Sequence, residues 1–474
     1  MQEPEYSNYN RMKKEIERFE LMEKGEHSFY FDVHTIENIF NFYSEKLQFD
    51  KAEKILSIGM QQHPQATSLY SKKAILLMEK GEDKKAIHLM ENLTKFDKSN
   101  TEVFLNLGLI YLRNKRVKDA QNCFDQALDT TPSEKENILL DLSSALNLSL
   151  NYSLSVKYLE KFYKEFPGNE NILFELAYAY DRAFQTNKSI KVYNHLLDLN
   201  PYSENAWYNL GIIYNKTGET KKAIDCYNYT LTINPGHAEA LINKGNASII
   251  LEKIEEALDC YFEYIAYGHD PTFVYHYIAD CYVLNENDEK ARAFFDLAVK
   301  VGEDFIDVWL GYISFLIKID DSKAAVNIAE KALEIHDEWD TGELTYLKAR
   351  ALLIDGKLYR ANKAFEKCIE MDEDNLKFFF DACQVKIAAN PESEKDDIIY
   401  EWLENYPDSS AVNYLAAAYY LIDSRNLTIA IKYLDKALSK DKYSFDFFLE
   451  LFPSIERMIK KSKKLDRLVY SYFS

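Results

Sequence analysis

Nine alanines recur in one phase of a 34-residue period, and this spacing constrains the fold more than any other feature of the chain. Ala52 and Ala86 are 34 residues apart, and most later members follow at 34 or close to a small multiple of it. Such a period is typical of stacked supersecondary units, because a single unit cannot bury its apolar face alone. The series is Ala52, Ala86, Ala120, Ala223, Ala257, Ala291, Ala325, Ala361 and Ala430.

Other residue types recur in phase with these alanines. In the repeat 204–237, with Glu204 as position 1, positions 4, 7, 8, 11, 20, 24 and 32 are Trp207, Leu210, Gly211, Tyr214, Ala223, Tyr227 and Pro235. The repeat 101–134 matches this pattern with Leu107, Gly108, Tyr111, Ala120, Phe124, Ala127 and Pro132. Together they resemble the tetratricopeptide repeat (TPR) family, in which each repeat is a pair of helices, A and B.

The repeated residue types have physical reasons. Positions 4, 7 and 11 form one apolar stripe on helix A. Position 8 is small in most repeats, which predicts a close contact of helix A with helix B, and position 20 is expected to form its other half. Glycine at position 15 (Gly81, Gly218, Gly356) predicts a turn with positive φ between the helices. Proline at position 32 predicts the end of helix B.

The resemblance implies an all-α, right-handed α-solenoid superhelix of about twelve TPR repeats with helical caps, a stand-alone array of the bacterial type. We expect an N-terminal capping helix in 1–32, repeats one to ten in 33–375, a degenerate repeat eleven in 376–410, repeat twelve in 411–444, and aromatic and basic capping helices in 445–474. The repeats begin near Val33, Thr67, Thr101, Glu136, Glu170, Glu204, Ala238, Thr272, Ile306, Gly342, Leu376 and Ala411.

Several repeats depart from the pattern. Ser155 and Ser189 replace alanine at position 20 of repeats four and five. Repeat nine has Tyr312 and Ile313 around position 8, where a small residue is expected. In repeat eleven, residues 389–393 interrupt the helical pattern with a proline, which predicts a bend or a longer loop.

The net charge of −20 argues against nucleic acid as a partner, because an acidic surface repels phosphate groups. The first residues lack the basic and apolar stretches of a signal peptide, and no run of eighteen apolar residues is present. A cytoplasmic protein without an integral membrane segment is therefore expected. The six cysteines form no C-x-x-C pair, which favours small helix residues over zinc ligands or disulfides.

No sequence motif indicates an enzyme. The chain has no phosphate-binding loop, no H-E-x-x-H and no G-x-S-x-G. The histidines are isolated, and Pro271 interrupts any helix that would align His269 with His276. We therefore expect no catalytic residue, no metal site and no cofactor.

The N-terminal segment predicts an amphipathic helix over 11–24 that ends at Gly25 and covers the first repeat. Its apolar face consists of Met12, Ile16, Phe19 and Met22.

The C-terminal segment differs from the rest of the chain in charge and composition. An aromatic stretch from Phe445 to Phe452 stops at Pro453, and a second helix with a basic cluster follows. This basic helix has three possible roles: a solubilising cap, a docking site for an acidic partner, or contact with an anionic membrane surface. The terminal aromatics could instead mediate a homodimer. The basic cluster is Arg457, Lys460, Lys461, Lys463, Lys464 and Arg467, and the terminal aromatics are Tyr470, Tyr472 and Phe473.

In TPR arrays the A helices line the concave face, and positions 2, 5, 6, 9, 12 and 13 point into it. Asn106, Asn209 and Asn243 share position 6, and Asn246 occupies position 9. An asparagine amide both donates and accepts, so a ladder of them can hold a peptide backbone of any sequence. The resemblance implies peptide binding there, to which tyrosines add contact area. The predicted peptide-binding residues are Asn106, Tyr178, Tyr208, Asn209, Ile212, Asn243, Asn246, His276 and Tyr277.

The best-known TPR specificity, a clamp for acidic chaperone tails, requires Lys and Arg at concave positions of three consecutive repeats. Repeats six to eight lack this basic set, since repeat eight supplies His276, Tyr277 and Asp280. A neutral-polar, aromatic or basic ligand is therefore favoured. The predicted function is a non-enzymatic scaffold that binds a protein or peptide segment in the groove. The alternative is a structural subunit of a multiprotein complex that uses its convex face or C-terminal helices, with a groove filled by a helix.

Overall fold

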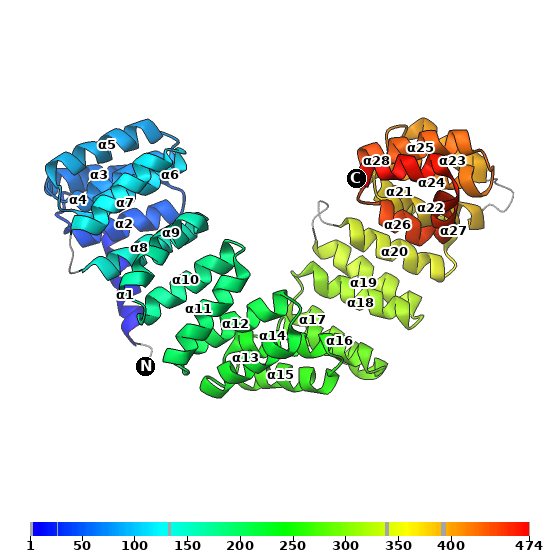
Figure 1. The fold of residues 1–474 in the computed structure, drawn as a ribbon, viewed down its shortest axis with the longest axis horizontal. Helices are drawn as coiled ribbons and strands as arrows, with labels where there is room; N and C mark the ends of the chain where they lie inside the picture. The colour runs from blue at the N-terminus through cyan, green and yellow to red at the C-terminus, as the bar shows by residue number, and fades with distance from the viewer. Residues whose placement is uncertain (1–2, 26, 131–133, 337–340, 390–394, 474) are drawn as a thin grey trace. The chain divides into compact units, whose positions relative to one another are not determined.

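The computed structural model describes residues 3–25, 27–130, 134–336, 341–389 and 395–473. Within these ranges the chain forms 28 α-helices and no strand, which confirms the predicted all-α solenoid class (Figure 1). The helices are α1 (Glu3–Glu23), α2 (Val33–Glu45), α3 (Phe49–Gln62), α4 (Thr67–Glu79), α5 (Asp83–Phe96), α6 (Thr101–Arg113), α7 (Val117–Thr130), α8 (Lys135–Leu148), α9 (Tyr152–Glu165), α10 (Glu170–Arg182), α11 (Thr186–Leu199), α12 (Glu204–Lys216), α13 (Thr220–Ile233), α14 (Ala238–Ile250), α15 (Ile254–Ala266), α16 (Val274–Leu284), α17 (Asp288–Val301), α18 (Ile306–Lys318), α19 (Ser322–Ile335), α20 (Gly342–Ile354), α21 (Leu358–Met371), α22 (Leu376–Ala389), α23 (Lys395–Asn405), α24 (Ser410–Ile422), α25 (Leu427–Lys440), α26 (Phe445–Leu451), α27 (Pro453–Lys461) and α28 (Lys463–Phe473).

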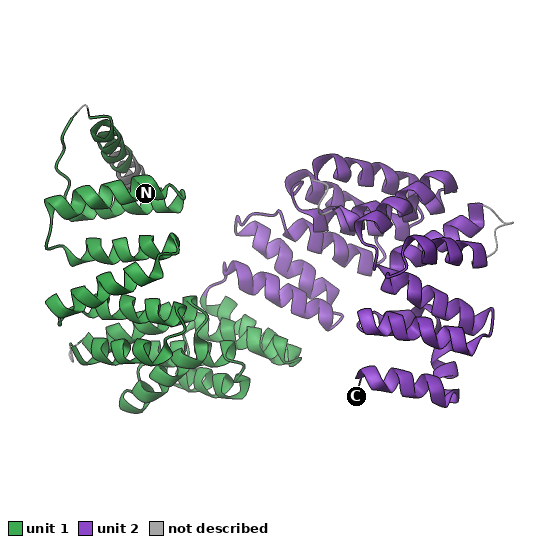
Figure 2. Ribbon diagram, turned by 90° about the horizontal axis from the view of Figure 1, so that it is seen from above, with its two compact units in different colours: residues 1–233 green, residues 234–474 purple. Residues whose placement is uncertain are grey.

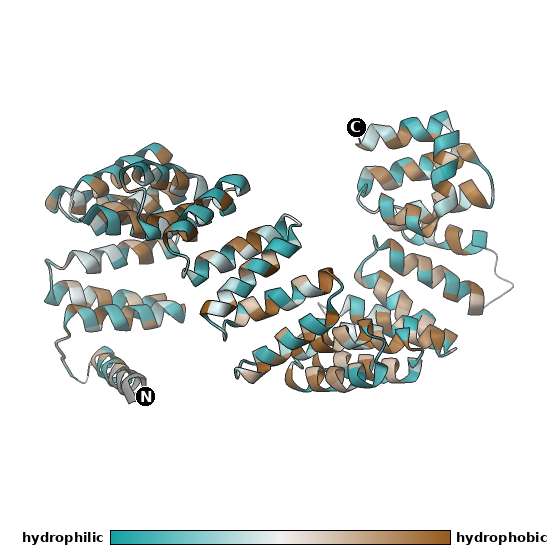
Figure 3. Ribbon diagram, turned by 60° about the horizontal axis from the view of Figure 1, so that its bottom comes forward, coloured by the Kyte–Doolittle hydropathy of each residue, from teal (hydrophilic) through white to brown (hydrophobic). Residues whose placement is uncertain are grey.

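The chain divides into two compact units, residues 1–233 and 234–474 (Figure 2). Unit 1 holds α1 and the helix pairs from α2/α3 to α12/α13, and unit 2 holds the pairs from α14/α15 to α24/α25 followed by α26–α28. Helix A of each pair packs against helix B, and most A helices also contact helix A of a neighbouring pair, as α10 contacts α12. Apolar and polar residues alternate along the helices, as an amphipathic stack requires (Figure 3).

The asparagines that precede several A helices fix where these helices begin. The side chain of Asn169 accepts a hydrogen bond from the Ile172 N–H at 3.0 Å, which satisfies a free amide of the first turn of α10. Its Nδ2 donates to Glu136 of the preceding repeat at 2.6 Å. Asn100 does the same for α6, since it caps Val103 and donates to Thr67 at 3.0 Å. One side chain thus starts a helix and joins two repeats.

The contact of helix A with helix B differs in one respect from the prediction. An added Cβ on the position-8 glycines Gly211 and Gly245 would lie 2.6 Å and 2.5 Å from ring atoms of Tyr227 and Tyr261. These tyrosines occupy position 24. The nearest neighbour of position 8 is therefore the aromatic ring at position 24, rather than the alanine at position 20. A small residue at position 8 is required because a ring fills the space above it.

Repeat nine departs from the pattern in two places that compensate for each other. Ile313 occupies position 8 and is fully buried, although the pattern requires a small residue there. Position 24 of the same repeat is Ala329, also fully buried, where six other repeats have an aromatic ring. Both belong to one apolar cluster. The large and small side chains have exchanged places, so the total volume in the core is maintained.

The turn between helices A and B requires a positive φ in nearly every repeat, although few repeats have glycine there. The φ angles of Gly81, Gly218 and Gly356 are +75°, +80° and +73°, as the sequence predicts. Non-glycine residues adopt the same conformation at position 15 elsewhere, at a cost of about 1–2 kcal/mol each. These residues are Leu47, Lys115, Leu150, Phe184, Glu252, Glu286, Asp320 and Arg425.

Replacing Glu252 with glycine is expected to raise the free energy of unfolding by about 0.5–1 kcal/mol, because glycine removes the left-handed strain at some cost in unfolded-state entropy. Glu252 is exposed and has a φ of 59°. Gly218→Ala is the matched control at position 15 of repeat six. An added Cβ there would meet nothing within 4 Å, so the expected loss of about 1 kcal/mol comes from the backbone alone. Urea unfolding of both variants measures these changes. If the free energy of unfolding changed in the same direction in both variants, this account would be contradicted.

The N-terminal helix α1 covers the first helix pair, but it begins at Glu3 rather than at Arg11. Pro4 is compatible with this earlier start because the first turn of a helix needs no amide donors. Phe19 is fully buried, and the Glu20 carboxylate accepts hydrogen bonds from the Tyr43 hydroxyl at 3.1 Å and from Lys51 at 3.0 Å. Gly25 follows the helix with a φ of +75°, as predicted.

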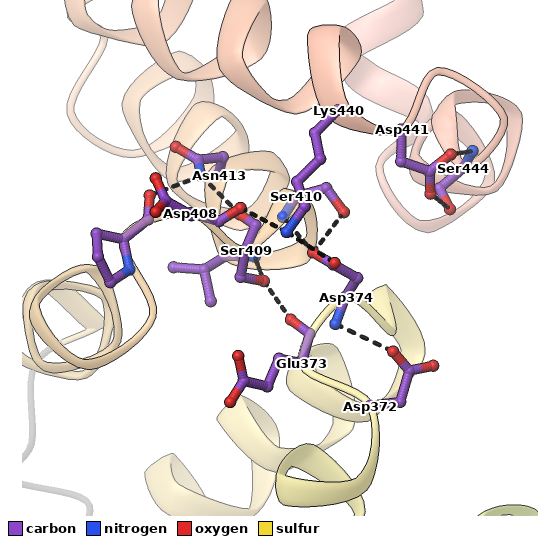
Figure 4. A network of polar contacts seen from close by, with 12 residues as sticks. Asp372, Glu373, Asp374, Asp408, Ser409, Ser410, Asn413, Lys440, Asp441 and Ser444 are labelled. Atoms are coloured by element: carbon purple, nitrogen blue, oxygen red, sulfur yellow. Dashed lines mark hydrogen bonds and ion pairs between the residues drawn. The ribbon is translucent and has the colours of Figure 1, made fainter.

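A polar network joins the loop before α22 to α24 and α25 (Figure 4). The Ser409 hydroxyl donates to the carbonyl oxygen of Glu373. The Asp374 carboxylate accepts the Ser410 N–H at 2.7 Å and pairs with Lys440 at 2.8 Å. Burial alone would raise the pKa of Asp374, but these bonds hold it below its usual value. The network fixes repeat eleven against repeat twelve; residues 390–394, which hold most of the predicted interruption, lie outside the described residues.

The C-terminal segment forms three helices rather than two. The predicted basic helix divides at Ser462, whose backbone is extended and whose hydroxyl accepts the Leu465 N–H at 3.5 Å. Helix α27 contacts α24, and α28 contacts α25. Phe448 is fully buried, and Phe445 is 5 % exposed. The aromatic stretch is therefore used mainly within the chain.

Candidate peptide-binding face of the A helices

The nine predicted peptide-binding residues divide between the two units, and all nine are half-buried. Asn106 (α6), Tyr178 (α10) and Tyr208, Asn209 and Ile212 (α12) lie in unit 1, and Asn243 and Asn246 (α14) and His276 and Tyr277 (α16) lie in unit 2. Within each unit, several of them surround a core tyrosine at position 24. Asn106, on α6, belongs to neither of these groups.

In unit 1 the group surrounds Tyr193 of α11, which is 1 % exposed. Burial raises the pKa of Tyr193; the Asn209 side chain lowers it, and the charges of Asp181 and Glu175 raise it further. These three side chains therefore lie near the phenol group, as does Tyr178.

The Glu175 carboxylate on this face has no cationic side chain as a partner among the described residues. Its Oε2 accepts a hydrogen bond from Asn147 of α8 at 3.2 Å. Burial raises the pKa of Glu175, and the Asn147 bond offsets this only in part. Asn147 itself is 9 % exposed, and its Oδ1 has no partner in the described part of the chain.

Asp181, six residues further along α10, already has a cationic partner. Its Oδ1 lies 3.5 Å from the Lys216 ammonium of α12. The charge of Asp181 also acts on the guanidinium of Arg182, whose pKa is raised chiefly by a hydrogen bond with Tyr152. Lys216 therefore pairs with Asp181, whereas Glu175 forms no ion pair within the described ranges.

In unit 2 the group surrounds Tyr261 of α15. The Tyr261 hydroxyl donates to Asn246 Oδ1 at 2.6 Å, so this bond orients the asparagine amide. The ring of Tyr277 stacks on that of Tyr261, with centroids 5.6 Å apart. An asparagine held in this way presents its N–H₂ group in a fixed direction, which reduces the entropy lost when a carbonyl binds.

His276 and Asp280 lie one helical turn apart on α16. The distance from His276 Nε2 to Asp280 Oδ2 is 3.5 Å. Burial raises the pKa of Asp280, and the nearby His276 lowers it. The imidazole packs where Gly311 of the next A helix leaves space, because a Cβ at Gly311 would lie 2.4 Å from the ring.

The nine predicted residues do not include Asn147 and Glu175 of the A helices α8 and α10, or Tyr193 and Tyr261 beneath this face. Position 24 is predicted to belong to the core, and these tyrosines are indeed buried, but their hydroxyls lie near side chains at A-helix positions that are predicted to face the ligand. The signal in the sequence was tyrosine rather than phenylalanine at position 24 of repeats five to seven. A buried tyrosine needs a polar partner for its hydroxyl.

The described residues contain no group of three or more His, Cys, Asp or Glu side chains arranged to hold a metal ion. The six cysteines are free thiols, five of them buried. No helix in the described ranges is both long and apolar enough to span a bilayer.

Comparison with known proteins identifies the repeat. A family model described as tetratricopeptide repeat matches residues 204–237, and a second model with the same description matches 101–134, 170–203 and 343–375. Each matched segment corresponds to one helix pair, such as α12/α13 for 204–237. The chain therefore contains tetratricopeptide repeats. These repeats support a role in protein interaction.

Several solved TPR structures are similar. A TPR protein from Parabacteroides merdae is 18% identical, with a TM-score of 0.41 over 54% of this chain and 100% of that chain. The C-terminal part of a TPR protein from Cytophaga hutchinsonii is 15% identical, with a TM-score of 0.44 over 50% of this chain and 97% of that chain. YrrB, described as a TPR protein with an unusual peptide-binding site, is 16% identical, with a TM-score of 0.33 over 40% and 96%. No curated protein matches the sequence.

Proposed function

We propose that this TPR protein is a non-enzymatic cytoplasmic scaffold that binds a peptide or protein segment on the concave face of its A helices. The observation that carries the proposal is the set of half-buried polar groups at A-helix positions 6, 9 and 12, several of which are oriented from below by tyrosines. Asn246 is fixed by Tyr261, and Asn209 lies beside Tyr193. Polar groups that are both partly desolvated and held in place bind a peptide backbone at low entropic cost. The acidic chain makes nucleic acid an unsuitable ligand.

A structural role in a larger assembly is the second candidate, and the C-terminal helices favour it. Phe452, between α26 and α27, packs edge-on against Phe380 of α22 at 5.5 Å. It closes an apolar pocket of about 240 Å³ whose wall includes Leu415 and Tyr419 of α24. These residues occupy positions 5 and 9 of their A helices, so the chain covers its own ligand-facing surface there. The basic cluster on α27 and α28 is exposed and could contact an acidic partner or an anionic surface.

Affinity purification from the source cells tests the first candidate. Ile212 is half-buried at position 9 of α12, so Ile212→Arg places bulk and charge on the proposed surface. Asn228→Arg, on the exposed side of the B helix α13, is the matched control. We expect a partner that is recovered with wild type and Asn228→Arg, and that falls by about 10-fold with Ile212→Arg, a loss of about 1.4 kcal/mol. Equal recovery with all three proteins would exclude this face as the binding surface.

A further inference from the structure

We propose that Glu175 and Asn147 bind one cationic side chain, a lysine ammonium or an arginine guanidinium, of the peptide held on unit 1. This inference rests on the proposed function, because it names the chemistry of one ligand residue at the same face. Helices α8 and α10 form this binding site, and Tyr193 of α11 lies next to it.

The charge of this site is unbalanced in the free protein. Glu175 occupies position 6, the position that holds asparagine in repeats three, six and seven. It is desolvated by its surroundings, and its partner in the described structure is an uncharged amide at 3.2 Å. A partly buried carboxylate without a cation is costly. The nearby Asp181 differs, since Lys216 lies 3.5 Å from it. A cationic side chain of the ligand would therefore be stabilised more at Glu175 than at Asp181.

The neighbouring polar atoms are those that a cation needs. Asn147 is nine-tenths buried, and the amide that donates to Glu175 carries an Oδ1 with no partner among the described residues. The Tyr193 hydroxyl lies near Asn209 and in the field of the same carboxylate. Together they offer a carboxylate and two neutral acceptors. Lysine and arginine side chains have several donors and no acceptor, so they match this set, whereas an anion would be repelled.

If Glu175 had a purely structural role, replacing it would lower the thermal stability of the free protein. The proposed binding role predicts that stability rises instead. In the Glu175→Gln variant, the glutamine side chain would keep an oxygen that accepts from Asn147 and would add an N–H₂ group that can donate to Asn147 Oδ1. The substitution would also remove a half-buried charge. We therefore expect Glu175→Gln to raise the thermal midpoint of the free protein by about 1–3 °C. A residue whose replacement stabilises the fold and weakens ligand binding is retained for binding.

Selection from a random phage-displayed peptide library on the purified full-length protein tests the proposal. The targets are wild type, Glu175→Gln and Glu263→Gln, the last being a substitution of an exposed glutamate of α15 that controls for net charge. We expect Lys or Arg to be enriched at one peptide position on wild type and on Glu263→Gln, and this preference to be lost on Glu175→Gln. Peptides without a basic preference, or a preference that survives Glu175→Gln, would overturn the inference and leave the proposed function intact. If wild type selects no peptide, both the peptide-binding proposal and the inference fail.

The best selected peptide and a copy with norleucine at the basic position then give the size of the effect. Norleucine keeps the aliphatic chain of lysine without the ammonium group. Fluorescence anisotropy is expected to show a loss of about 10-fold or more for the norleucine peptide on wild type, and less than about 2-fold on Glu175→Gln. Equal losses on the two proteins, or a lower thermal midpoint for Glu175→Gln, would contradict the assignment.

Discussion

Replacing Ala329 with tyrosine is expected to destabilise unit 2 by about 2–3 kcal/mol, although it brings repeat nine closer to the TPR pattern. In repeats six and seven, a tyrosine at position 24 covers a glycine at position 8. In repeat nine, position 8 is the fully buried Ile313, and the space for a ring is already filled. A ring added there must displace close-packed neighbours, which is the usual origin of overpacking costs.

A double-mutant cycle measures whether the two positions exchange volume as proposed. Ile313→Gly alone leaves a cavity and places glycine within a helix, so it too is destabilising. Combined with Ala329→Tyr, it recreates the arrangement of repeats six and seven, and we expect a favourable coupling energy of about 2 kcal/mol. Glu334→Tyr, at an exposed position of α19, controls for the tyrosine itself and should change stability by less than about 0.5 kcal/mol. Additive effects in urea unfolding would show that the positions do not pack together.

This example shows how far the sequence determines the fold. The period and the apolar stripe predict helix pairs in the correct phase, because burial of one face per helix depends on residue spacing alone. Helices α6 and α12 begin at Thr101 and Glu204, the first residues of the two clearest repeats. What the pattern cannot provide is compensation between positions. Ile313 departs from the pattern in isolation and fits only because Ala329 lies on the neighbouring helix.

The candidate site was less predictable than the fold for a similar reason. Periodicity predicts which A-helix positions face a ligand, and Asn209 and Asn246 occupy two of these positions. It does not show which buried groups approach them from helix B. Glu175 belongs to the same row, but it becomes distinctive only when Asn147, 28 residues away, is seen to be its partner. Pairwise polar contacts between repeats depend on side-chain direction, which a repeat pattern leaves open.

The C-terminal helices complete the core of unit 2 and are not a detachable tail. In α24 every residue is buried except Tyr419 and Ile422, although an A helix normally leaves its ligand-facing side open. This burial occurs because α22, α25 and α27 all contact α24. The terminal repeat of a solenoid would otherwise expose an apolar face. Covering it with α26–α28 also closes the predicted ligand-facing side at repeats eleven and twelve.

Phe448→Ala is accordingly expected to lower the free energy of unfolding of unit 2 by about 3–5 kcal/mol. The Phe448 ring is fully buried, its centroid lies 4.9 Å from that of Tyr414 on α24, and it also contacts Phe452 at 5.5 Å. Its removal leaves a cavity between the C-terminal helices and the last repeat. Urea unfolding followed by far-UV circular dichroism measures the loss, and hydrogen exchange locates it.

Phe473→Ala is the matched control, because that ring is 51% exposed and lies at the edge of the same aromatic group, 5.5 Å from Phe445. A change of less than about 1 kcal/mol is expected there. Hydrogen exchange should quicken in α24 for Phe448→Ala and remain unchanged for Phe473→Ala. If Phe448→Ala also costs less than about 1 kcal/mol, the C-terminal helices are only loosely attached. They would then be free to leave the A-helix face of repeats eleven and twelve, which would extend the surface available to a ligand.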